Sequence, residues 1–503
     1  MNNGKICVSV CAASTDEFIK SATRAESLAD VVELRFDCLE KSELENALER
    51  TCNYKTERTL LLTFRPKEQG GKRELDVRTR ELFWCSGYDF CASWADVELD
   101  LIEAASHWLF EKTFCSYHDF NSVPDNLHQI YEKLNATNAD VLKIAARADD
   151  ITDSIAVWKL IERAKKDNKQ IVPIAMGEAG KWTRILGLAH GAFMTYASLE
   201  NGSETAPGQI SAVDLTETYR VKELDEQTEI YGIIGGNTSY SMSPYMHNAA
   251  FKFHNLNAVY VPFQVQNLDE FIERFVRRET REIELNLKGF SVTIPHKQAI
   301  IKHLDFVDDI ARKIGAVNTV KISGGELHGY NTDARGFIEP LKNTYGDLEN
   351  TKVAVIGNGG AARACIYALG REGAKVTIYA RDSEKAKNLA DEFDVSLTEL
   401  EFETSNFNSF DVVVNATSLG TIGELQNETP ATAGQIKNVH LVYDLIYNPF
   451  ETRFLHEAKS VGVPTIGGLA MLVAQAMAQF VIWTELDAPM KEMSRSALRK
   501  LQS

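Results

Sequence analysis

A lysine and a histidine lie at the ends of two short apolar runs in the first third of the chain. Lys143 stands in Val-Leu-Lys-Ile-Ala-Ala, and His118 ends Ser-Tyr-His. Burial disfavours the charged form of a lysine amine and so frees a nucleophile for Schiff-base chemistry. A histidine can move protons near neutral pH. The two residues predict covalent catalysis with proton transfer. The alternatives are that the lysine side chain extends to solvent at the rim and that the histidine has only a structural role.

Other charged residues end neighbouring apolar runs. Glu33 and Arg35 end one run, Arg65 ends the next, and Arg184 follows a later one. Arginine can bind a carboxylate through two parallel hydrogen bonds. Charged groups at the same end of several strands need a common pocket, so we expect these arginines to hold a carboxylate and hydroxyls there.

A glycine-rich turn follows the apolar run 352–356 in the second half. The turn reads Gly357, Asn358, Gly359, Gly360, Ala361. Such glycines let the backbone approach a pyrophosphate at a helix amino terminus, although the motif alone also fits a tight turn between packed elements.

The cofactor preference follows from the residues after the next predicted strand. NAD-binding folds usually place an acidic residue about 20 positions beyond the glycine motif. Here the first charged residue is Arg381, and Lys385 follows one helical turn later. We expect NADP to be preferred, with Asp382 capping the next helix rather than repelling the phosphate.

Several polar residues lie in turn-rich segments of the second half, and each alone is best explained as a cap of a helix or turn. They are Ser241, Ser243, Thr293, Lys297, Asn318, Asp333.

Eight apolar runs recur in the first 200 residues. They are Ile6–Val10, Val31–Phe36, Leu60–Phe64, Val97–Leu101, Phe114–Tyr117, Val141–Ala145, Ile171–Ala175, Ala192–Ala197. Stretches with helical spacing, such as Asp153–Lys166, separate most of them. The alternation predicts an α/β fold with a (β/α)8 barrel, whose chemistry lies at the carboxyl ends of the strands. An open doubly wound sheet is the alternative.

The length of 503 residues suits two domains. A polar segment from Thr216 to Glu229 interrupts the pattern and predicts a linker. We expect four parts: a barrel over 1–218, a linker over 219–229, a substrate subdomain over 230–335 and 470–503, and a Rossmann subdomain over 336–469.

Composition narrows the partners. The net charge of −17 disfavours nucleic acid and acidic membranes. Eight cysteines without zinc-like spacing predict no metal, and reduced, buried thiols in a cytosolic protein. With no signal-like amino terminus and no apolar run of about 18 residues, we expect a cytoplasmic location. The oligomeric state stays open.

Residues 5 to 218 resemble the type I 3-dehydroquinate dehydratases. The matching segments are Val8–Val10, Glu33–Arg35, Thr63–Arg65, Ser116–Asp119, Lys143–Ala145, Met176–Gly177, Thr183–Arg184, Ala206–Gln209. The resemblance implies a (β/α)8 barrel, an imine between Lys143 and the C3 ketone of 3-dehydroquinate, and proton transfer by His118. The implied substrate-binding residues are Ser9, Glu33, Arg35, Arg65, Arg184, Thr205, Gln209. Gln69 stands where the family usually has glutamate, so we expect a different pH profile for His118.

Residues 229 to 503 resemble shikimate dehydrogenase. Further matching segments are Asn415–Ser418, Asp444–Pro449, Gly467–Gln475. The resemblance implies that Lys297 and Asp333 exchange the proton while hydride passes between shikimate and NADP. The implied shikimate-binding residues are Ser241, Ser243, Thr293, Lys297, Asn318, Asp333, Tyr447, Gln475. Thr417, Leu445 and Gly468 would join the glycine turn at the cofactor.

The order of the two halves is that of the bifunctional 3-dehydroquinate dehydratase/shikimate dehydrogenases. We expect dehydration of 3-dehydroquinate to 3-dehydroshikimate, then reduction to shikimate with NADPH. One rival is a quinate dehydrogenase in the second half, which the paired serines Ser241 and Ser243 disfavour. Another is an inactive metabolite-binding regulator, which should have lost Lys143, His118 or their counterparts in the second half.

Overall fold

The structure is a computed structural model that describes residues 2, 4–85, 93–105 and 110–502. The chain forms two compact units, the first over Met1–Tyr240 with Asn257–Leu287 and the second over Ser241–Leu256 with Lys288–Ser503.

The first unit is built on eight parallel strands in the order β7-β6-β5-β4-β3-β2-β1-β8, followed by a short β9. They are β1 (Ile6–Val10), β2 (Val31–Arg35), β3 (Thr59–Thr63), β4 (Trp94–Glu98), β5 (Lys112–Asp119), β6 (Val141–Arg147), β7 (Gln170–Met176), β8 (Thr195–Ser198), β9 (Ile210–Ser211). Each of the eight predicted runs overlaps a strand, which confirms the predicted barrel.

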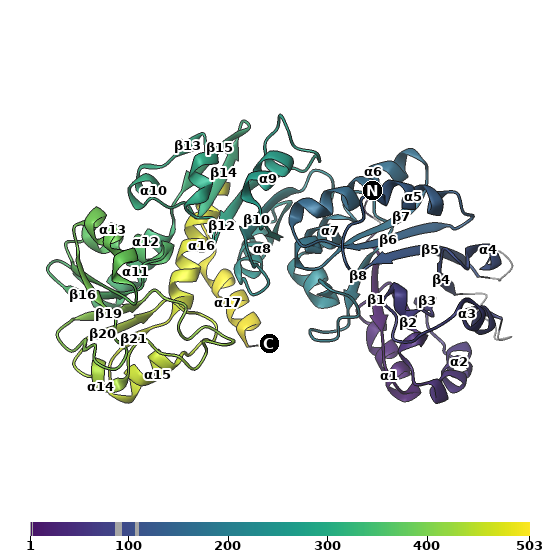
Figure 1. Ribbon diagram of the computed structural model, residues 1–503, viewed down its shortest axis with the longest axis horizontal. Coiled ribbons are helices and arrows are strands. Elements are labelled where there is room, and N and C mark those ends of the chain that lie inside the picture. Colours follow the sequence, from purple (N-terminus) through teal and green to yellow (C-terminus); the bar gives the residue numbers. More distant parts are fainter. Residues whose placement is uncertain (1, 3, 86–92, 106–109, 503) are drawn as a thin grey trace. The chain divides into compact units, whose positions relative to one another are not determined.

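Helices alternate with these strands and lie outside the curled sheet (Figure 1). They are α1 (Thr15–Glu26), α2 (Leu44–Cys52), α3 (Val77–Trp84), α4 (Ile102–Ala105), α5 (Leu127–Asn135), α6 (Ser154–Lys166), α7 (Lys181–Leu186). In α6 the apolar residues that recur at helical spacing, Ile155, Trp158 and Ile161 among them, are buried.

The fourth strand begins earlier than the sequence predicts. The predicted run was Val97–Leu101, whereas β4 covers Trp94–Glu98. Asp96 and Glu98 lie within the observed strand. Both carboxylates are buried and form ion pairs with Arg65, so the charges belong to the interior.

The inward-facing residues of the barrel form layers, because side chains alternate between the two faces of a strand. A lower apolar layer includes Cys7, Val31, Leu61, Trp94, Phe114, Val141. Two residues further along each of these strands, the same face carries Ser9, Glu33, Thr63, Asp96, Ser116, Lys143. All six are buried, so each strand contributes one group to a polar layer above an apolar floor.

The first unit continues beyond the barrel with a parallel strand pair, β10 (Glu229–Gly235) and β11 (Ala258–Gln264), then α9 (Leu268–Phe271) and a π-helix (Ile272–Val276). Phe275 packs edge-on against Trp182 of α7, with ring centroids 5.3 Å apart. Arg220 donates a 2.8 Å hydrogen bond to the carbonyl of Ala258. Val221 in the predicted linker is buried, so this segment is packed rather than extended into solvent.

The second unit has two sheets. The first is a six-stranded sheet, of which this unit contains the run β12-β14-β15-β13, and the second, all parallel, has the order β18-β17-β16-β19-β20-β21. The strands are β12 (Leu287–Val292), β13 (Phe306–Val307), β14 (Thr319–Ser323), β15 (Glu326–Tyr330), β16 (Lys352–Ile356), β17 (Lys375–Ala380), β18 (Ser396–Glu399), β19 (Val412–Asn415), β20 (Leu441–Asp444), β21 (Thr465–Ile466). The parallel sheet is the predicted Rossmann arrangement.

The helices of the second unit pack on these sheets (Figure 1). They are α8 (Ser243–Phe253), α10 (Asp309–Ile314), α11 (Asp333–Tyr345), α12 (Gly360–Arg371), α13 (Ser383–Phe393), α14 (Ala433–Ile436), α15 (Arg453–Ser460), α16 (Gly468–Thr484), α17 (Met490–Leu501). In the part of the chain that the structure describes, no helix has the length and apolarity needed to cross a membrane.

The cysteines differ from the prediction of reduced, buried thiols. Cys11 and Cys38 form a disulfide, and Cys52 and Cys85 are exposed, whereas Cys7 is buried and free. The prediction was wrong for the pair because β1 and β2 are adjacent parallel strands. Their carboxyl ends meet, which brings together cysteines that are 27 positions apart in the sequence.

Candidate active sites

One cavity at the carboxyl ends of the barrel strands is lined by every residue predicted for the first site. They are Ser9, Glu33, Arg35, Arg65, His118, Lys143, Arg184, Thr205, Gln209. Most of them lie on or directly after neighbouring strands of the sheet, whereas Arg184 lies on α7 and Thr205 and Gln209 lie in the loop before β9.

The amine of Lys143 is buried and surrounded by acceptors. Its Nζ lies 2.7 Å from Asp96 Oδ2, 2.9 Å from the hydroxyl of Tyr196 and 3.6 Å from Glu33 Oε1. Burial opposes the charge of Asp96, but Arg65 and Lys143 outweigh it and hold the pKa of this carboxyl well below its usual value. Asp96 is therefore a carboxylate that accepts hydrogen bonds and has no proton to give.

His118 ends β5 beside this amine. Burial lowers its pKa well below the usual value, and the charges of Arg65 and Lys143 add to the effect. The imidazole is therefore neutral at physiological pH. Its buried Nδ1 has no hydrogen-bond partner among the described residues. The backbone N–H of His118 donates a 2.8 Å hydrogen bond to Gln69 Oε1, so Gln69 holds the strand end and not the ring.

The three arginines of the cavity differ in their partners. Arg35 donates to both carboxylate oxygens of Asp37, at 2.8 and 2.9 Å. Arg65 forms ion pairs with Asp96 and Glu98 at 2.6 and 2.8 Å. The Nε and Nη1 of Arg184 bond to no described residue. Burial lowers its pKa to about 10, so it keeps its charge at neutral pH.

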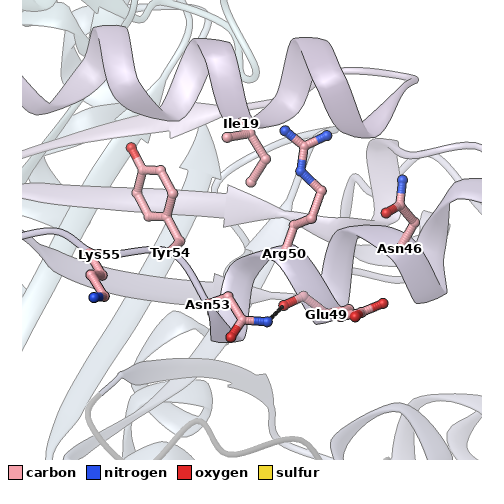
Figure 2. A pocket seen from close by; sticks show the side chains of 7 residues that line it. All are labelled: Ile19, Asn46, Glu49, Arg50, Asn53, Tyr54 and Lys55. Atoms are coloured by element: carbon pink, nitrogen blue, oxygen red, sulfur yellow. Dashed lines mark hydrogen bonds between the residues drawn. The ribbon is translucent and has the colours of Figure 1, made fainter.

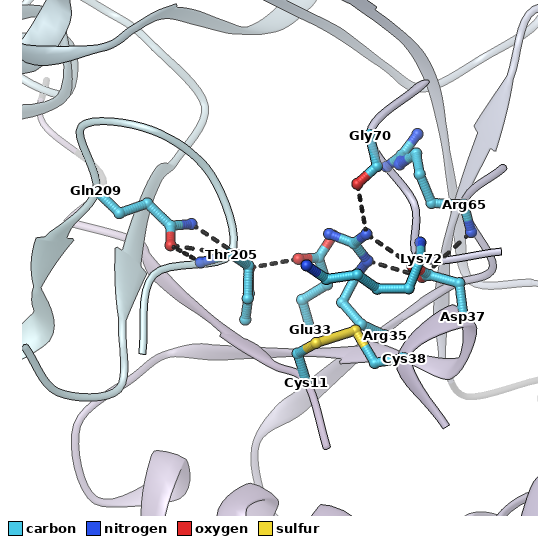
Figure 3. The surroundings of a disulfide bond; sticks show 11 residues. Cys11, Glu33, Arg35, Asp37, Cys38, Arg65, Gly70, Lys72, Thr205 and Gln209 are labelled. Carbon is cyan, nitrogen blue, oxygen red and sulfur yellow. Dashed lines mark hydrogen bonds and ion pairs between the residues drawn. A yellow bond between two sulfur atoms is a disulfide. The ribbon is translucent and has the colours of Figure 1, made fainter. Parts of the chain in front are cut away.

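The rim of the cavity is built from the ends of β1 and β2 and from the loop before β9. Ser9 donates to Glu33, and Thr205 donates its backbone N–H to Gln209 Oε1 at 2.7 Å. The Cys11–Cys38 disulfide lies beside Glu33 and Arg35 (Figure 3). It ties together two strand ends that carry site residues.

The second group of predicted residues meets in the second unit. Lys297, in the turn after β12, has its Nζ 2.5 Å from Asp333 Oδ2 at the start of α11. Asn318, before β14, donates to Asp333 Oδ1 at 2.8 Å. The pair is largely buried, with side-chain exposures of 17% for Lys297 and 7% for Asp333. The structure thus brings these three predicted residues into direct contact.

The other predicted shikimate residues lie on neighbouring elements. Ser243 begins α8, and Ser241 Oγ accepts its backbone N–H at 3.2 Å. Gln475 of α16 packs against Gly336 of α11, where an added Cβ would lie 2.7 Å from Cβ of Gln475. Half-buried Thr293 follows β12, and half-buried Tyr447 follows β20.

The glycine turn joins β16 to α12 as predicted. Gly357 has a φ of +118°, and a Cβ there would lie 2.9 Å from the Ala416 carbonyl, so only glycine fits. No atom lies within 4 Å of a Cβ added at Gly359, which leaves space at the amino terminus of α12. Gly468 packs on the backbone of Leu445, 2.3 Å from where a Cβ would be.

The residues after β17 are arranged as the sequence predicts. The Asp382 carboxylate accepts the backbone N–H of Lys385 and caps α13. Lys385 Nζ also lies 2.9 Å from Asp382 Oδ2. Arg381, directly after the strand, is exposed. Asp382 is thus engaged with its own helix, and Arg381 is the charge available at the strand end.

Comparison with known proteins identifies the family. The sequence model of type I 3-dehydroquinase matches residues 6–226. Models of the shikimate dehydrogenase substrate binding domain, of shikimate/quinate 5-dehydrogenase and of the shikimate 5'-dehydrogenase C-terminal domain match 233–320, 339–445 and 468–498. The chloroplastic bifunctional 3-dehydroquinate dehydratase/shikimate dehydrogenase of Arabidopsis thaliana is 35% identical over 97% of this chain and 83% of that protein. The chain belongs to this bifunctional family.

Relatives of the dehydrogenase half agree. The NADP(+) shikimate dehydrogenase of Caldanaerobacter subterraneus is 42% identical over 52% of this chain and 94% of that protein. A crystal structure of a shikimate dehydrogenase in complex with NADP+ has a TM-score of 0.51 and 36% identity, and covers 56% of this chain and 98% of that one. The bifunctional shikimate-pathway enzyme expected from the sequence is thereby confirmed.

Sequence reasoning missed three buried residues around this bifunctional enzyme's first site, two of which contact the Lys143 amine while Glu98 pairs with Arg65. They are Asp96, Glu98, Tyr196. Asp96 and Glu98 face inward at alternate positions of β4 after Trp94 of the apolar floor, so correct strand bounds would have revealed them. Tyr196 read as an ordinary apolar strand residue. Only the contact of its hydroxyl with Lys143 distinguishes it.

A second hollow lies on the outer surface of the barrel, between α1 and α2 (Figure 2). Most of its polar residues are exposed, Arg50 pairs with Asp16, and Asn53 donates to the Glu49 carbonyl at 2.9 Å. These groups bond to their own helices or to the neighbouring helix instead of converging on the hollow, and we assign it no function.

Proposed function

We propose that the first half of this bifunctional enzyme dehydrates 3-dehydroquinate through an imine on Lys143. The observation that carries the proposal is a buried lysine amine in a cavity that also holds neutral His118 and the guanidinium of Arg184, whose Nε and Nη1 have no partner among the described residues. An imine draws electrons from the adjacent carbon, which acidifies its C–H bond.

Each group then has one task. Lys143 loses its proton and attacks the C3 ketone. His118 removes the C2 proton, for which a neutral imidazole is required, and returns a proton to the departing C1 hydroxyl. Arg184 binds the substrate carboxylate through donors that no described residue occupies. Ser9, Glu33 and Gln209 would hold hydroxyls.

Borohydride trapping tests this step. Reduction of the enzyme with 3-dehydroquinate should leave a stable adduct on Lys143. Lys143→Ala should abolish the adduct and dehydration, while shikimate oxidation in the same chain stays normal and a retained thermal unfolding transition of the barrel shows that the first half is folded. A Lys143→Ala chain that dehydrates at the normal rate would end the proposal.

In the second half we propose that Lys297 and Asp333 move the proton of the shikimate C3 hydroxyl. The carboxylate and ammonium are in contact, so either can exchange a proton with a hydroxyl placed beside the pair. Asn318 fixes the carboxylate by its 2.8 Å hydrogen bond. Ser241, Ser243, Thr293, Tyr447 and Gln475 would hold the rest of the substrate.

The second half also fits NADP. Gly357 allows the tight turn, and the start of α12 offers free backbone N–H groups beside open space at Gly359. Asn358, Gly360, Ala361 and Thr417 would line the phosphates, and Leu445 and Gly468 the nicotinamide. NADP supplies or accepts the hydride when bound.

We propose a preference for NADP over NAD, carried by Arg381. It can form two charge-assisted bonds with the 2′-phosphate, while Asp382 caps α13 and holds Lys385. Comparing kcat/KM for both cofactors at saturating shikimate tests this. Arg381→Ala should mainly raise the KM for NADP, and equal values in the unmodified enzyme would overturn the assignment.

Substitution separates the roles in the second site. Lys297→Ala or Asp333→Ala should lower shikimate oxidation by about 10²-fold or more, the effect of losing an acid–base group. NADP affinity should survive, and dehydration in the first half is the internal control. A loss of NADP affinity at unchanged turnover would show that the roles are misassigned.

We further propose the four parts read from the sequence: a barrel over 1–218, a linker over 219–229, a substrate subdomain over 230–335 and 470–503, and a Rossmann subdomain over 336–469. We also propose a metal-free enzyme that acts in the cytoplasm on small molecules. Cell fractionation tests the location, and recovery of the protein in an organelle would contradict it.

A further inference from the structure

Tyr196 lies on β8 with its side chain inside the barrel. It is 3% exposed, belongs to the core cluster below the polar layer and lines the same cavity as Lys143. Among the described residues, its hydroxyl makes one hydrogen bond, which it accepts from Lys143 Nζ at 2.9 Å. The proton of this hydroxyl is therefore committed to no described acceptor.

Imine formation needs a proton to move from nitrogen to oxygen. When the amine attacks a ketone, the N–C bond forms and the carbonyl π electrons pass to oxygen. The new ammonium must then lose a proton, and the alkoxide must gain one. Direct transfer would pass through a strained four-membered ring of N, C, O and H. A hydroxyl that bridges both atoms enlarges this ring to six members.

The surroundings of Lys143 offer few groups for this task. Asp96 is a carboxylate without a proton, and Glu33 accepts hydrogen bonds from Ser9 and Thr63. In the part of the chain that the structure describes, no hydrogen bond joins His118 to Lys143. Tyr196 alone combines a direct contact to Nζ with a hydroxyl proton.

Resting on the imine mechanism above, we propose that Tyr196 is a catalytic proton relay for imine formation. Its hydroxyl accepts the proton from the Lys143 nitrogen and gives its own to the ketone oxygen, so the tyrosine is unchanged afterwards. The same exchange protonates the carbinolamine hydroxyl, which then leaves as water when the C–O bond breaks.

Two features of the site suit a relay rather than a stored charge. Burial raises the pKa of Tyr196 well above its usual value, so the hydroxyl keeps a proton at every stage. The aromatic ring also lies 4.1 Å from Lys143 Nζ, which holds the amine beside the hydroxyl.

Tyr196→Phe in the full chain tests the relay, because phenylalanine keeps the ring and removes only the hydroxyl. Imine formation, followed by rapid quenching with borohydride and mass measurement of the adduct, should slow by about 10²-fold, the effect of losing an acid–base group. The KM for 3-dehydroquinate should change little. Tyr131→Phe is the matched control, since it removes a buried hydroxyl that bonds Asp167 at 2.8 Å outside the cavity.

The outcomes separate the two proposals. If the unmodified enzyme forms no adduct, the imine mechanism fails and the relay fails with it. If it forms the adduct and Tyr196→Phe forms it equally fast, only the relay is overturned. Loss of shikimate oxidation or of the thermal unfolding transition would reveal that Tyr196→Phe does not fold. In that case the solvent deuterium isotope effect on imine formation is measured in the unmodified enzyme. An isotope effect of 1 overturns the relay, and a clear slowing in D2O supports it.

Discussion

At the scale of single residues, the partners of a buried charge indicate what it does. Arg35 pairs with Asp37 and Arg65 pairs with Asp96, so both shape the cavity, and Arg65 also holds the carboxylate that contacts Lys143. Arg184 is equally buried but has two nitrogens without a described partner. A buried unpaired cation costs stability, and such a cost is retained where a ligand supplies the missing partner.

Arg184→Met should therefore weaken the binding of 3-dehydroquinate and stabilise the folded protein. Methionine fills similar volume without a charge, so Tm should rise, by about 2–4 °C for each kcal/mol gained. The KM for 3-dehydroquinate should increase about 10-fold or more, because charge-assisted hydrogen bonds are lost. Scanning calorimetry and steady-state kinetics measure the two effects. Arg147→Met, at an exposed arginine paired with Asp149, is the control. A lower Tm with unchanged KM would contradict the assignment.

Gln69→Glu should change the pH dependence of dehydration. Gln69 is a neutral acceptor for the His118 backbone. A carboxylate there would favour the imidazolium and raise the pKa of His118. Since the neutral imidazole is the active form, the acid limb of the kcat/KM profile should move to higher pH. Glu68→Gln, one position away and exposed, should leave that limb in place. An unmoved limb in Gln69→Glu would mean that His118 does not control it.

At the scale of elements, hydrogen bonds between side chains fix how helices meet strands near the second site. His247 of α8 lies 3.3 Å from Gln479 Oε1 of α16, and Ser291 of β12 donates to the same oxygen at 2.9 Å. Gln479 also donates to the Asn318 carbonyl at 3.2 Å. Gln479 thus links α8, α16, β12 and the residue that orients Asp333.

The buried histidine in this link should make the second unit sensitive to acid. Burial lowers the pKa of His247 to about 3, while an unfolded histidine titrates near 6.5. Between these values the unfolded state binds more protons, so stability is full above about pH 6.5 and falls with decreasing pH by up to about 1.4 kcal/mol per unit. His247→Gln should flatten this slope in urea unfolding at pH 4.5 to 7. An unchanged slope would show that another group causes it.

At the scale of the whole molecule, a compact unit need not end where a sequence family ends. The dehydratase family match ends at residue 226, whereas the first compact unit also includes β10, β11 and the π-helix. Trp182 with Phe275, Arg220 with Ala258, and Lys159 with Glu282 join the barrel to these later residues. Residues 257–287, which lie beyond the dehydratase family match in the sequence, therefore pack against the dehydratase barrel.

Cutting the chain between Glu226 and Gln227 tests this cover. A site-specific nick should leave both activities present and the pieces associated during gel filtration, because the contacts on either side of the cut persist. The isolated piece 1–226 should still dehydrate 3-dehydroquinate but unfold at lower temperature, since Trp182 loses Phe275 and becomes exposed. Pieces that separate at once, with an unchanged Tm for the barrel, would show that these contacts contribute nothing.

The sequence by itself determined the barrel strands and the glycine turn, because apolar periodicity and turn chemistry are local. His118 and Lys143 stand at strand ends, and parallel strands bring such ends together whatever lies between them. The capping of α13 by Asp382 could also be predicted, because it joins residues only three positions apart in the sequence.

Only the tertiary structure decided how the charges pair. Asp96 reaches Lys143 across 47 positions, and Cys11 reaches Cys38 across 27. Nothing in the spacing of these residues indicates the contacts, since strand order and inward orientation are properties of the assembled sheet. For the same reason the sequence does not show that two nitrogens of Arg184 lack a partner, or that the Tyr196 hydroxyl contacts the Lys143 amine. Both features matter only because the folded barrel excludes water, so that a buried polar group needs a partner or a ligand.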